Sequence, residues 1–192
     1  MAKLVYGIGI NDRSCPAKTA GGGTREYTSW MKMLERCYAE LAFFKNPTYV
    51  GCSVSKNFKN YSFFYQWCQN QIGFDREGFE LDKDLLIKGN KLYSEDNCVF
   101  IPRCLNTLLV NCKQVRGEFP IGVTWNNSRY LAQLSAFGKL QYLGTFPTPQ
   151  EAFQAYKQAK EAHIKDMAQL YKANIDPRAY AALMSYQVEI TD

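Results

Sequence analysis

The chain has 192 residues, 46% of them hydrophobic and 21% charged, which is enough apolar material for one large or two small cores and excludes a disordered protein. Its formal net charge of +5 is compatible with a polyanionic partner but is not diagnostic of one. No apolar run approaches the roughly 20 residues of a membrane span, and the glycine-interrupted start is too short for a signal peptide. We therefore expect a cytoplasmic protein with no membrane partner.

The cysteines argue against a zinc centre. The chain has seven cysteines, none of them in a Cys-x-x-Cys pair, and His163 is its one histidine. Structural zinc sites are normally built from paired cysteines and histidines at short spacing. We expect free thiols in a reducing compartment and no zinc.

The first half of the chain begins with a basic arm and continues with helices and short strands. Residues 1–26 contain a Gly21-Gly-Gly23 joint and read as a flexible arm, either a solvated leader or a segment that touches phosphate. Apolar residues at helical spacing predict helices over residues 27–44 and 61–71, with a short strand near residues 53–55. Their aromatic stripes favour a core over a base-stacking surface. Extended segments over residues 79–86 and 98–101 flank a Gly89-Asn90 turn, and a helix is expected after Pro102.

The second half has a clearer pattern. Residues 113–120 are polar and read as a linker. Strands are predicted over residues 121–125, 130–137 and 140–145, with turns at residues 126–128 and at Gly138. Thr148 is a candidate N-cap for a long helix with Pro149 in its first turn, and residues 174–192 read as a tail with a helix over residues 178–186.

The predicted sheet has one covered face and one free face. Strand alternation places Tyr130, Ala132, Leu134 and Ala136 on one side and Leu131, Gln133 and Ser135 on the other. The alanines suit close packing against the long helix, whose expected stripe is Ala152, Ala155, Tyr156, Ala159 and Ala162. The opposite face then has no cover from this segment, and a free sheet face of this kind can enter the major groove of DNA.

These residues resemble a known family. The order Gly122-Val-Thr-Trp, Tyr130-Leu-Ala-Gln-Leu, Gly138-Lys-Leu-Gln-Tyr-Leu-Gly-Thr-Phe146, Thr148-x-x-Glu-Ala152 and Ala155-Tyr156 is similar to the Apetala / ethylene-response-factor type DNA-binding domain. The resemblance implies such a domain over residues 121–173 and double-stranded DNA as partner. The residues it implies for DNA contact are Thr124, Asn126, Arg129, Leu131, Gln133, Ser135, Leu140 and Tyr142.

This copy departs from the family pattern, because several of these positions hold no arginine or tryptophan. Bidentate recognition of guanine is therefore weakened. Lys113, Arg116, Arg129 and Lys139 are the candidate phosphate contacts, each weighed equally against an ordinary solvated side chain.

Residues 27–112 resemble the HNH endonucleases of phages. The motifs are Tyr27-x-x-Trp30, Met33-Leu-x-Arg-Cys-Tyr38, Thr48-Tyr49, Phe63-x-x-x-Trp67, Leu81-Asp-Lys-Asp84, Gly89-Asn-Lys-x-Tyr-Ser94 and Asn97-Cys-Val-Phe100. In that family the nuclease fold is often joined to an Apetala-type domain, which is the order seen here. The resemblance implies a homing-type enzyme acting in a phage-infected bacterial cell.

The HNH resemblance implies metal-assisted phosphodiester cleavage by Asp82, Lys83, Asp84, Asn97 and Asn106. Asp82 and Asn106 are the implied ligands of one Mg²⁺ or Mn²⁺ ion, Asn97 matches the asparagine that ties the loop, and Asp84 adds a second carboxylate. The position of the general-base histidine holds Lys83, which is normally protonated near neutral pH.

Two interpretations follow from Lys83. In the first, the chain is an HNH-type endonuclease or nickase in which water or a carboxylate replaces the missing base. In the second, the HNH-like fold is a scaffold without catalysis, and Lys83 contacts phosphate in a DNA-binding or regulatory protein. A third class is an adaptor that uses the open sheet face against a host protein. The expected fold is α+β: an HNH-like ββα element with flanking helices, then a three-stranded antiparallel sheet packed on one long helix.

Overall fold

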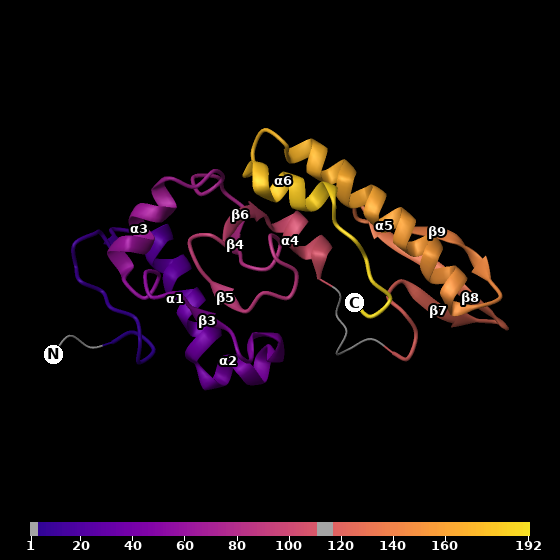
Figure 1. Ribbon diagram of the computed structural model, residues 1–192, viewed down its shortest axis with the longest axis horizontal. Coiled ribbons are helices and arrows are strands. Elements are labelled where there is room, and N and C mark those ends of the chain that lie inside the picture. Colours follow the sequence, from indigo (N-terminus) through magenta and orange to yellow (C-terminus); the bar gives the residue numbers. More distant parts are fainter. Residues whose placement is uncertain (1–3, 111–116) are drawn as a thin grey trace. The chain divides into compact units, whose positions relative to one another are not determined.

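The computed structural model describes residues 4–110 and 117–192, and it confirms the α+β class (Figure 1). The chain divides into two compact units. The first contains Met1–Arg103 and Asn174–Ala179, and the second contains Cys104–Ala173 and Tyr180–Asp192. The predicted arm therefore groups with the first unit, and the predicted tail is shared between the units. The first half of the predicted linker, residues 113–116, lies outside the described residues, and Lys113 and Arg116 lie in it.

The first long helix is interrupted where the sequence predicts continuity. Helix α1 spans Arg25–Tyr38, is capped by the Thr24 side chain, and buries Trp30, Met33, Leu34 and Cys37. Ala39 is extended, with φ −91° and ψ 119°, and a short helix α2 then spans Glu40–Lys45. The prediction of one helix over residues 27–44 was wrong, because no glycine or proline marks the break. The 3-10 helix η1 follows at Pro47–Tyr49.

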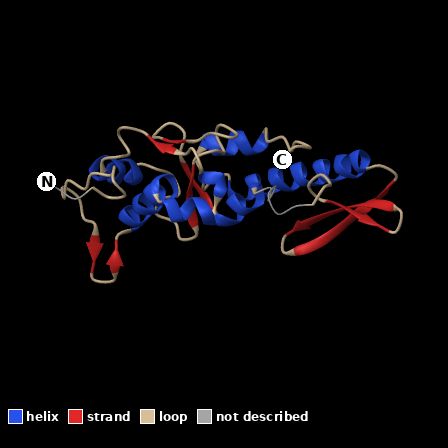
Figure 2. Cartoon of the chain, turned by 90° about the horizontal axis from the view of Figure 1, so that it is seen from below, coloured by secondary structure: helices blue, strands red, loops and turns tan. Residues whose placement is uncertain are grey.

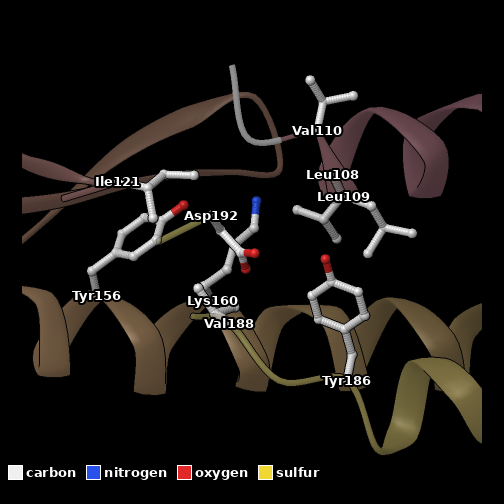
Figure 3. Close-up of a pocket in the computed structure, with 9 residues that line it drawn as sticks. All are labelled: Leu108, Leu109, Val110, Ile121, Tyr156, Lys160, Tyr186, Val188 and Asp192. Carbon is white, nitrogen blue, oxygen red and sulfur yellow. The ribbon is translucent and has the colours of Figure 1, made fainter. Parts of the chain in front are cut away.

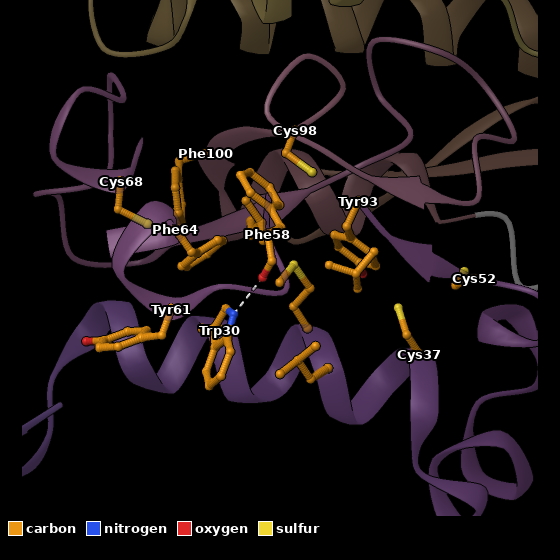
Figure 4. Packing of buried hydrophobic residues seen from close by; sticks show 14 of the residues in the cluster. Trp30, Cys37, Cys52, Phe58, Tyr61, Phe64, Cys68, Tyr93, Cys98 and Phe100 are labelled. Atoms are coloured by element: carbon orange, nitrogen blue, oxygen red, sulfur yellow. Dashed lines mark hydrogen bonds between the residues drawn. The ribbon is translucent and has the colours of Figure 1, made fainter. Parts of the chain in front are cut away.

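Helix α3 and α1 share an aromatic core. Helix α3 spans Tyr61–Gln69, and its N-cap is Asn60, whose Oδ1 accepts from the Ser62 N–H at 2.9 Å. Trp30 of α1 lies among these rings and donates from Nε1 to the Phe58 carbonyl at 2.7 Å (Figure 4). The prediction that the aromatic stripes form core is confirmed for Trp30 and Phe64, which have no exposed surface, whereas Phe63 of the same stripe is 37% exposed.

The strands of the first unit form three small pairs. Strand β1 (Lys18–Thr19) pairs with β2 (Gly22–Gly23) in a hairpin. Strand β3 (Ser53–Val54) pairs in parallel with β5 (Leu92–Tyr93), which the sequence pattern did not predict. Strand β4 (Phe79–Asp82) pairs antiparallel with β6 (Val99–Pro102), and helix α4 (Arg103–Leu109) follows directly. Strand β4 is shorter than predicted, because Asp82 turns the chain.

The N-terminal segment is anchored to the first unit. The Ile10 N–H donates to the Lys59 carbonyl at 2.8 Å, and the Ile10 carbonyl accepts from Tyr61 N–H at 2.9 Å. Farther along, the Tyr61 hydroxyl donates to the Pro16 carbonyl at 2.5 Å. These bonds hold residues 10–16 beside α3, where we had expected a free arm.

The second unit contains the predicted three-stranded antiparallel sheet packed against a long helix (Figure 2). Its strands are β7 (Val123–Asn126), β8 (Arg129–Ala136) and β9 (Lys139–Phe146), in that order. Both connecting hairpins have two-residue turns with positive φ, at Asn127 and Ser128 and at Phe137 and Gly138. Such turns match the right-handed twist of the strands they join.

The long helix packs on the sheet with a different stripe from the expected one. Helix α5 spans Pro149–Tyr171. Its N-cap is Thr148, as predicted, and the Thr148 Oγ1 accepts from the Glu151 N–H at 3.3 Å. Of the expected stripe, only Ala152 and Tyr156 are buried, while Ala162 is exposed. The buried stripe is turned about the helix axis and continues through Phe153, His163, Ile164, Met167 and Ala168.

The end of the chain folds back along α5. Helix α6 spans Pro177–Met184, and Val188 beyond it is buried. The Lys157 ammonium donates to the Val188 carbonyl at 2.7 Å, and the Val188 N–H donates to Glu161 Oε1 at 2.9 Å. The cavity beside Lys160 has a volume of about 10 Å³, which leaves room for about one water molecule (Figure 3).

None of the helices in the described part of the chain has the length and apolar character needed to cross a membrane.

Candidate nucleic-acid interface and metal site

Cross-strand pairing assembles the predicted contact residues on one face of the sheet. Thr124 pairs with Leu131 and Asn126 with Arg129 between β7 and β8. Between β8 and β9 the pairs are Gln133 with Tyr142 and Ser135 with Leu140. Paired residues project to the same side of a sheet, so all eight share one face, hereafter the front face.

The front face is open. Leu140 is 69% exposed and Tyr142 is 67% exposed, whereas Ala132, Leu134 and Ala136 on the other side of β8 are buried. An irregularity in pairing at Ala132 and Gln133 leaves one extra residue in β9. A bulge of this kind shifts the alternation of a strand, and here it keeps Leu140 and Tyr142 on the same side as Gln133.

The charge of the front face is small. Lys139 pairs with the buried Ala136, so its register belongs to the helix side of the sheet and not to the front face. The expectation that Lys139 contacts phosphate stays a prediction. Arg116 falls outside the described residues, and Arg129 is the one cation among the front-face residues that the structure describes.

His163 is a buried packing residue of the second unit. It is 8% exposed, and its ring centroid lies 4.5 Å from that of Phe137 in an edge-to-face contact. Burial, and next the positive charge of Lys160, lower the pKa of His163, with Asp166 opposing. The imidazole is therefore held neutral.

We expect His163 to make the second unit sensitive to acid. A histidine whose folded pKa is lowered contributes stability that is complete above the ordinary pKa, about 6.5, and is lost as the pH falls below it. The stability advantage of wild type over His163→Gln should therefore shrink on acidification. Thermal melting of both proteins across this range measures the difference; a constant gap would contradict the expectation.

Asp82 is a buried carboxylate at the end of β4. It is 7% exposed, and its Oδ1 accepts from the N–H groups of Asp84 at 3.0 Å and Leu85 at 2.7 Å. Burial, and next the negative charge of Asp84, raise the pKa of Asp82 to about 6, although the two N–H bonds act in the opposite direction. A cation that binds this buried carboxylate stabilises its charged form.

Lys83 is enclosed by the same turn. It is 6% exposed, and its ammonium donates to Asp84 Oδ2 at 2.8 Å and to the Asn90 carbonyl at 3.0 Å. Burial opposes the charged form, but the bond to Asp84 and that carboxylate's charge outweigh it and raise the pKa of Lys83. Lys83 is therefore a charged tie within the loop. Its proton cannot leave near neutral pH, and its buried ammonium does not face solvent as a phosphate contact would.

Asn90 ties the loop, and sequence reasoning missed it. Its Nδ2 donates to the carbonyls of Lys83 at 2.6 Å and Leu92 at 2.7 Å, and its Oδ1 accepts from Leu92 N–H at 3.0 Å. Asn97, the predicted tie, contributes through its backbone, where its N–H donates to the Ser94 hydroxyl at 3.3 Å. The Gly89-Asn90 pair was interpreted only as a turn, although an asparagine there can bond to the backbone on either side.

The residues of the Asp82 turn fit a hydrated divalent ion. No group of three or more His, Cys, Asp or Glu suited to a metal occurs in residues 4–110 and 117–192. Mg²⁺, however, is usually held by one or two carboxylates and keeps several waters. Asp82 Oδ2 has no hydrogen bond to the described protein atoms, which leaves it for such an ion. Asn106 belongs to the second unit, so its pairing with Asp82 stays a prediction.

Comparison with known proteins adds no neighbour. No family model, no curated protein and no solved structure matches the chain. The functional argument therefore depends on the residues themselves and on the motif resemblances noted in the sequence.

Proposed function

We propose that this protein binds double-stranded DNA through the front face of β7–β9 and is an HNH-type endonuclease or nickase that uses one divalent metal ion at Asp82. The observation that carries the proposal is the front face itself. Its back is closed by α5, while its polar and aromatic side chains stay uncovered. A twisted strand pair or sheet of this size fits the major groove, where base edges are exposed.

The front-face side chains suit base edges more than phosphates. Gln133 and Asn126 carry the amide group that pairs with adenine, and Leu131 and Leu140 are apolar groups that can contact a thymine methyl. Arg129 supplies a single guanidinium for guanine or phosphate. We therefore expect moderate affinity with a shallow salt dependence from this face alone.

The cleavage part of the proposal depends on Asp82 and on the HNH resemblance. The resemblance places the ββα element in the segment where β4 pairs with β6 and α4 follows β6, with β5 between the two strands in the chain, and Asp82 ends β4. Asp82 would hold Mg²⁺ or Mn²⁺, which when bound activates water and neutralises charge on a phosphodiester. Asn106 remains the second ligand that the resemblance implies. Lys83 keeps Asp84 in place by its ion pair and does not take up a proton.

The front face is tested by replacing residues on either side of the sheet. Gln133→Ala and Tyr142→Ala should each weaken duplex binding by about 1–3 kcal/mol, the range for a base contact. Gln141→Ala is the matched control, because Gln141 pairs with the buried Leu134 and so points to the helix side. Fluorescence anisotropy with a mixed-sequence duplex measures the affinities. Equal effects of all three changes, or none, would remove the front face as the contact surface.

A second candidate function is DNA binding without catalysis, as a regulatory protein or scaffold. The enclosure of Lys83 favours it, because the position of the general base holds a paired cation. Metal-independent duplex binding without nicking of supercoiled plasmid would support this candidate. An adaptor role on a host protein is the third, and front-face variants that lose protein capture but keep DNA affinity would identify it.

A further inference from the structure

An open groove lies on the N-terminal segment of the first unit, and neither the front-face residues nor those of the Asp82 turn line it. Its volume is about 310 Å³, and it is lined by Asn11, Arg13, Cys15, Ala17, Lys18 and Tyr27. This volume lies at the lower end of the range for ligand sites in proteins.

The walls of this groove are fixed by hydrogen bonds. Thr24 N–H donates to the Ala17 carbonyl at 3.1 Å, and the Thr24 hydroxyl lies 3.1 Å from the Tyr61 hydroxyl. The Tyr27 ring packs edge-on against the Tyr61 ring at 5.2 Å. Arg13 has φ 62°, and its N–H donates to Asn11 Oδ1 at 3.0 Å. The groove is therefore preorganised before any ligand binds.

Two cations and no acid line the groove. Arg13 and Lys18 are exposed, and within the described part of the chain neither side chain forms an ion pair or a hydrogen bond. The nearby carboxylates are hydrogen-bonded to neutral groups and keep their negative charge: Asp12 accepts from the Ser62 hydroxyl at 2.5 Å, and Glu26 accepts from Gln69 at 2.6 Å. Neither acid lines the groove.

We propose that this groove binds a phosphodiester segment of a nucleic-acid strand, with Arg13 and Lys18 on the phosphate and Tyr27 against the adjoining sugar or base. The choice of a nucleic-acid strand rests on the proposed function. The groove then forms a second DNA contact, carried by the first unit and separate from the front face.

The geometry favours a strand over other anionic partners. Two cations and an aromatic ring line the same groove, which is the combination that binds backbone and base together in single-strand sites. An acidic peptide would leave the Tyr27 ring without a stacking partner. A free phosphate ion would contact only the cations and would leave most of the volume unfilled.

Cys15 reports occupancy of the groove. It is half-buried in the lining, while the other described cysteines of the first unit are buried. In full-length Cys104→Ser/Cys112→Ser protein, a maleimide should therefore label Cys15, at mildly alkaline pH because burial raises the pKa of its thiol. We expect a short single-stranded oligonucleotide to slow this labelling several-fold, and inorganic phosphate at the same phosphate concentration to have no such effect.

Charge-neutralising variants complete the test. Arg13→Asn suits the left-handed backbone, and together with Lys18→Gln it should abolish protection of Cys15 and lower the salt slope of duplex binding by about 1–2, since each phosphate contact contributes about 0.9. Lys56→Gln, an exposed lysine of the same unit, should change neither, and unchanged melting verifies folding. The proposal for the groove is overturned if the oligonucleotide does not protect Cys15, or if inorganic phosphate protects it equally well. It is also overturned if the double variant keeps the protection. Front-face variants that fail to alter duplex binding overturn the front face instead, so the two failures are distinct.

Discussion

Replacing Gly122 with alanine is expected to unfold the second unit of the chain. Gly122 has φ 76°, and a Cβ placed on it would lie 1.9 Å from Tyr156 Cδ2 and 2.3 Å from two further ring atoms. The left-handed conformation costs an alanine about 1–2 kcal/mol. Overpacking against a buried ring costs about 1–3 kcal/mol more. Hydrogen exchange should show lost protection in β7–β9, with that of β4 and β6 kept, and duplex binding should fall with it.

Gly138→Ala separates the two causes. Gly138 has nearly the same φ, 73°, but a Cβ there would meet no atom within 4 Å. It should therefore lose only the conformational part, about 1–2 kcal/mol. Tyr156→Ala combined with Gly122→Ala should recover part of the loss, because the clash is removed. Equal destabilisation by Gly122→Ala and Gly138→Ala would show that the close approach of Tyr156 is not what requires glycine.

The same comparison shows which parts of the second unit are predictable. Strand alternation and the residues of both hairpin turns are local, so β7, β8 and β9 follow from the sequence within about one or two residues. The lack of space for a Cβ at Gly122 is caused by Tyr156, a residue far along the chain, and no local pattern reveals it. The side of α5 that packs on the sheet is set by the large residues Phe153, Ile164 and Met167 as well as by alanines, and the alanine spacing alone gave the wrong stripe.

The first unit departs more from its sequence pattern, because its loops are held by non-local polar contacts. The break at Ala39 has no local marker, and the two-residue strand β5 exists only by pairing with β3. The N-terminal segment looks flexible in composition, yet Tyr61 and Ser62 of α3 bind its backbone and side chains. The candidate site follows the same rule: the motif identified Asp82, but the burial and ion pair of Lys83 depend on Asn90 and on the turn between them.

Replacing Asp82 with asparagine is expected to abolish nicking while keeping the fold. The amide oxygen of asparagine can still accept from the N–H groups of Asp84 and Leu85, but the negative charge that would hold a divalent ion is gone. Asp82→Ala should lose the two turn bonds as well, at a cost of about 1–3 kcal/mol for the unpaired donors. Nicking of supercoiled plasmid with Mg²⁺ or Mn²⁺ should fall at least about 100-fold in both variants, the size of loss seen when an electrostatic catalytic group is removed.

The pH dependence of stability gives a second readout of Asp82. Its folded pKa of about 6 is raised above the ordinary 3.8, so the charged form is disfavoured by folding. The contribution of the Asp82 carboxyl to the free energy of unfolding is complete below the ordinary pKa and is lost as the pH rises through about 6. Asp82→Asn should therefore melt higher than wild type at neutral pH, and the gap should close on acidification. A metal bound at Asp82 narrows this gap, since binding to the folded state alone adds about 1.4 kcal/mol at ten times its dissociation constant. Wild type that gains no thermal stability from Mg²⁺ or Mn²⁺, or an Asp82→Asn protein that nicks as well as wild type, would leave the β4–β6 element as a scaffold for DNA binding and not as a nuclease.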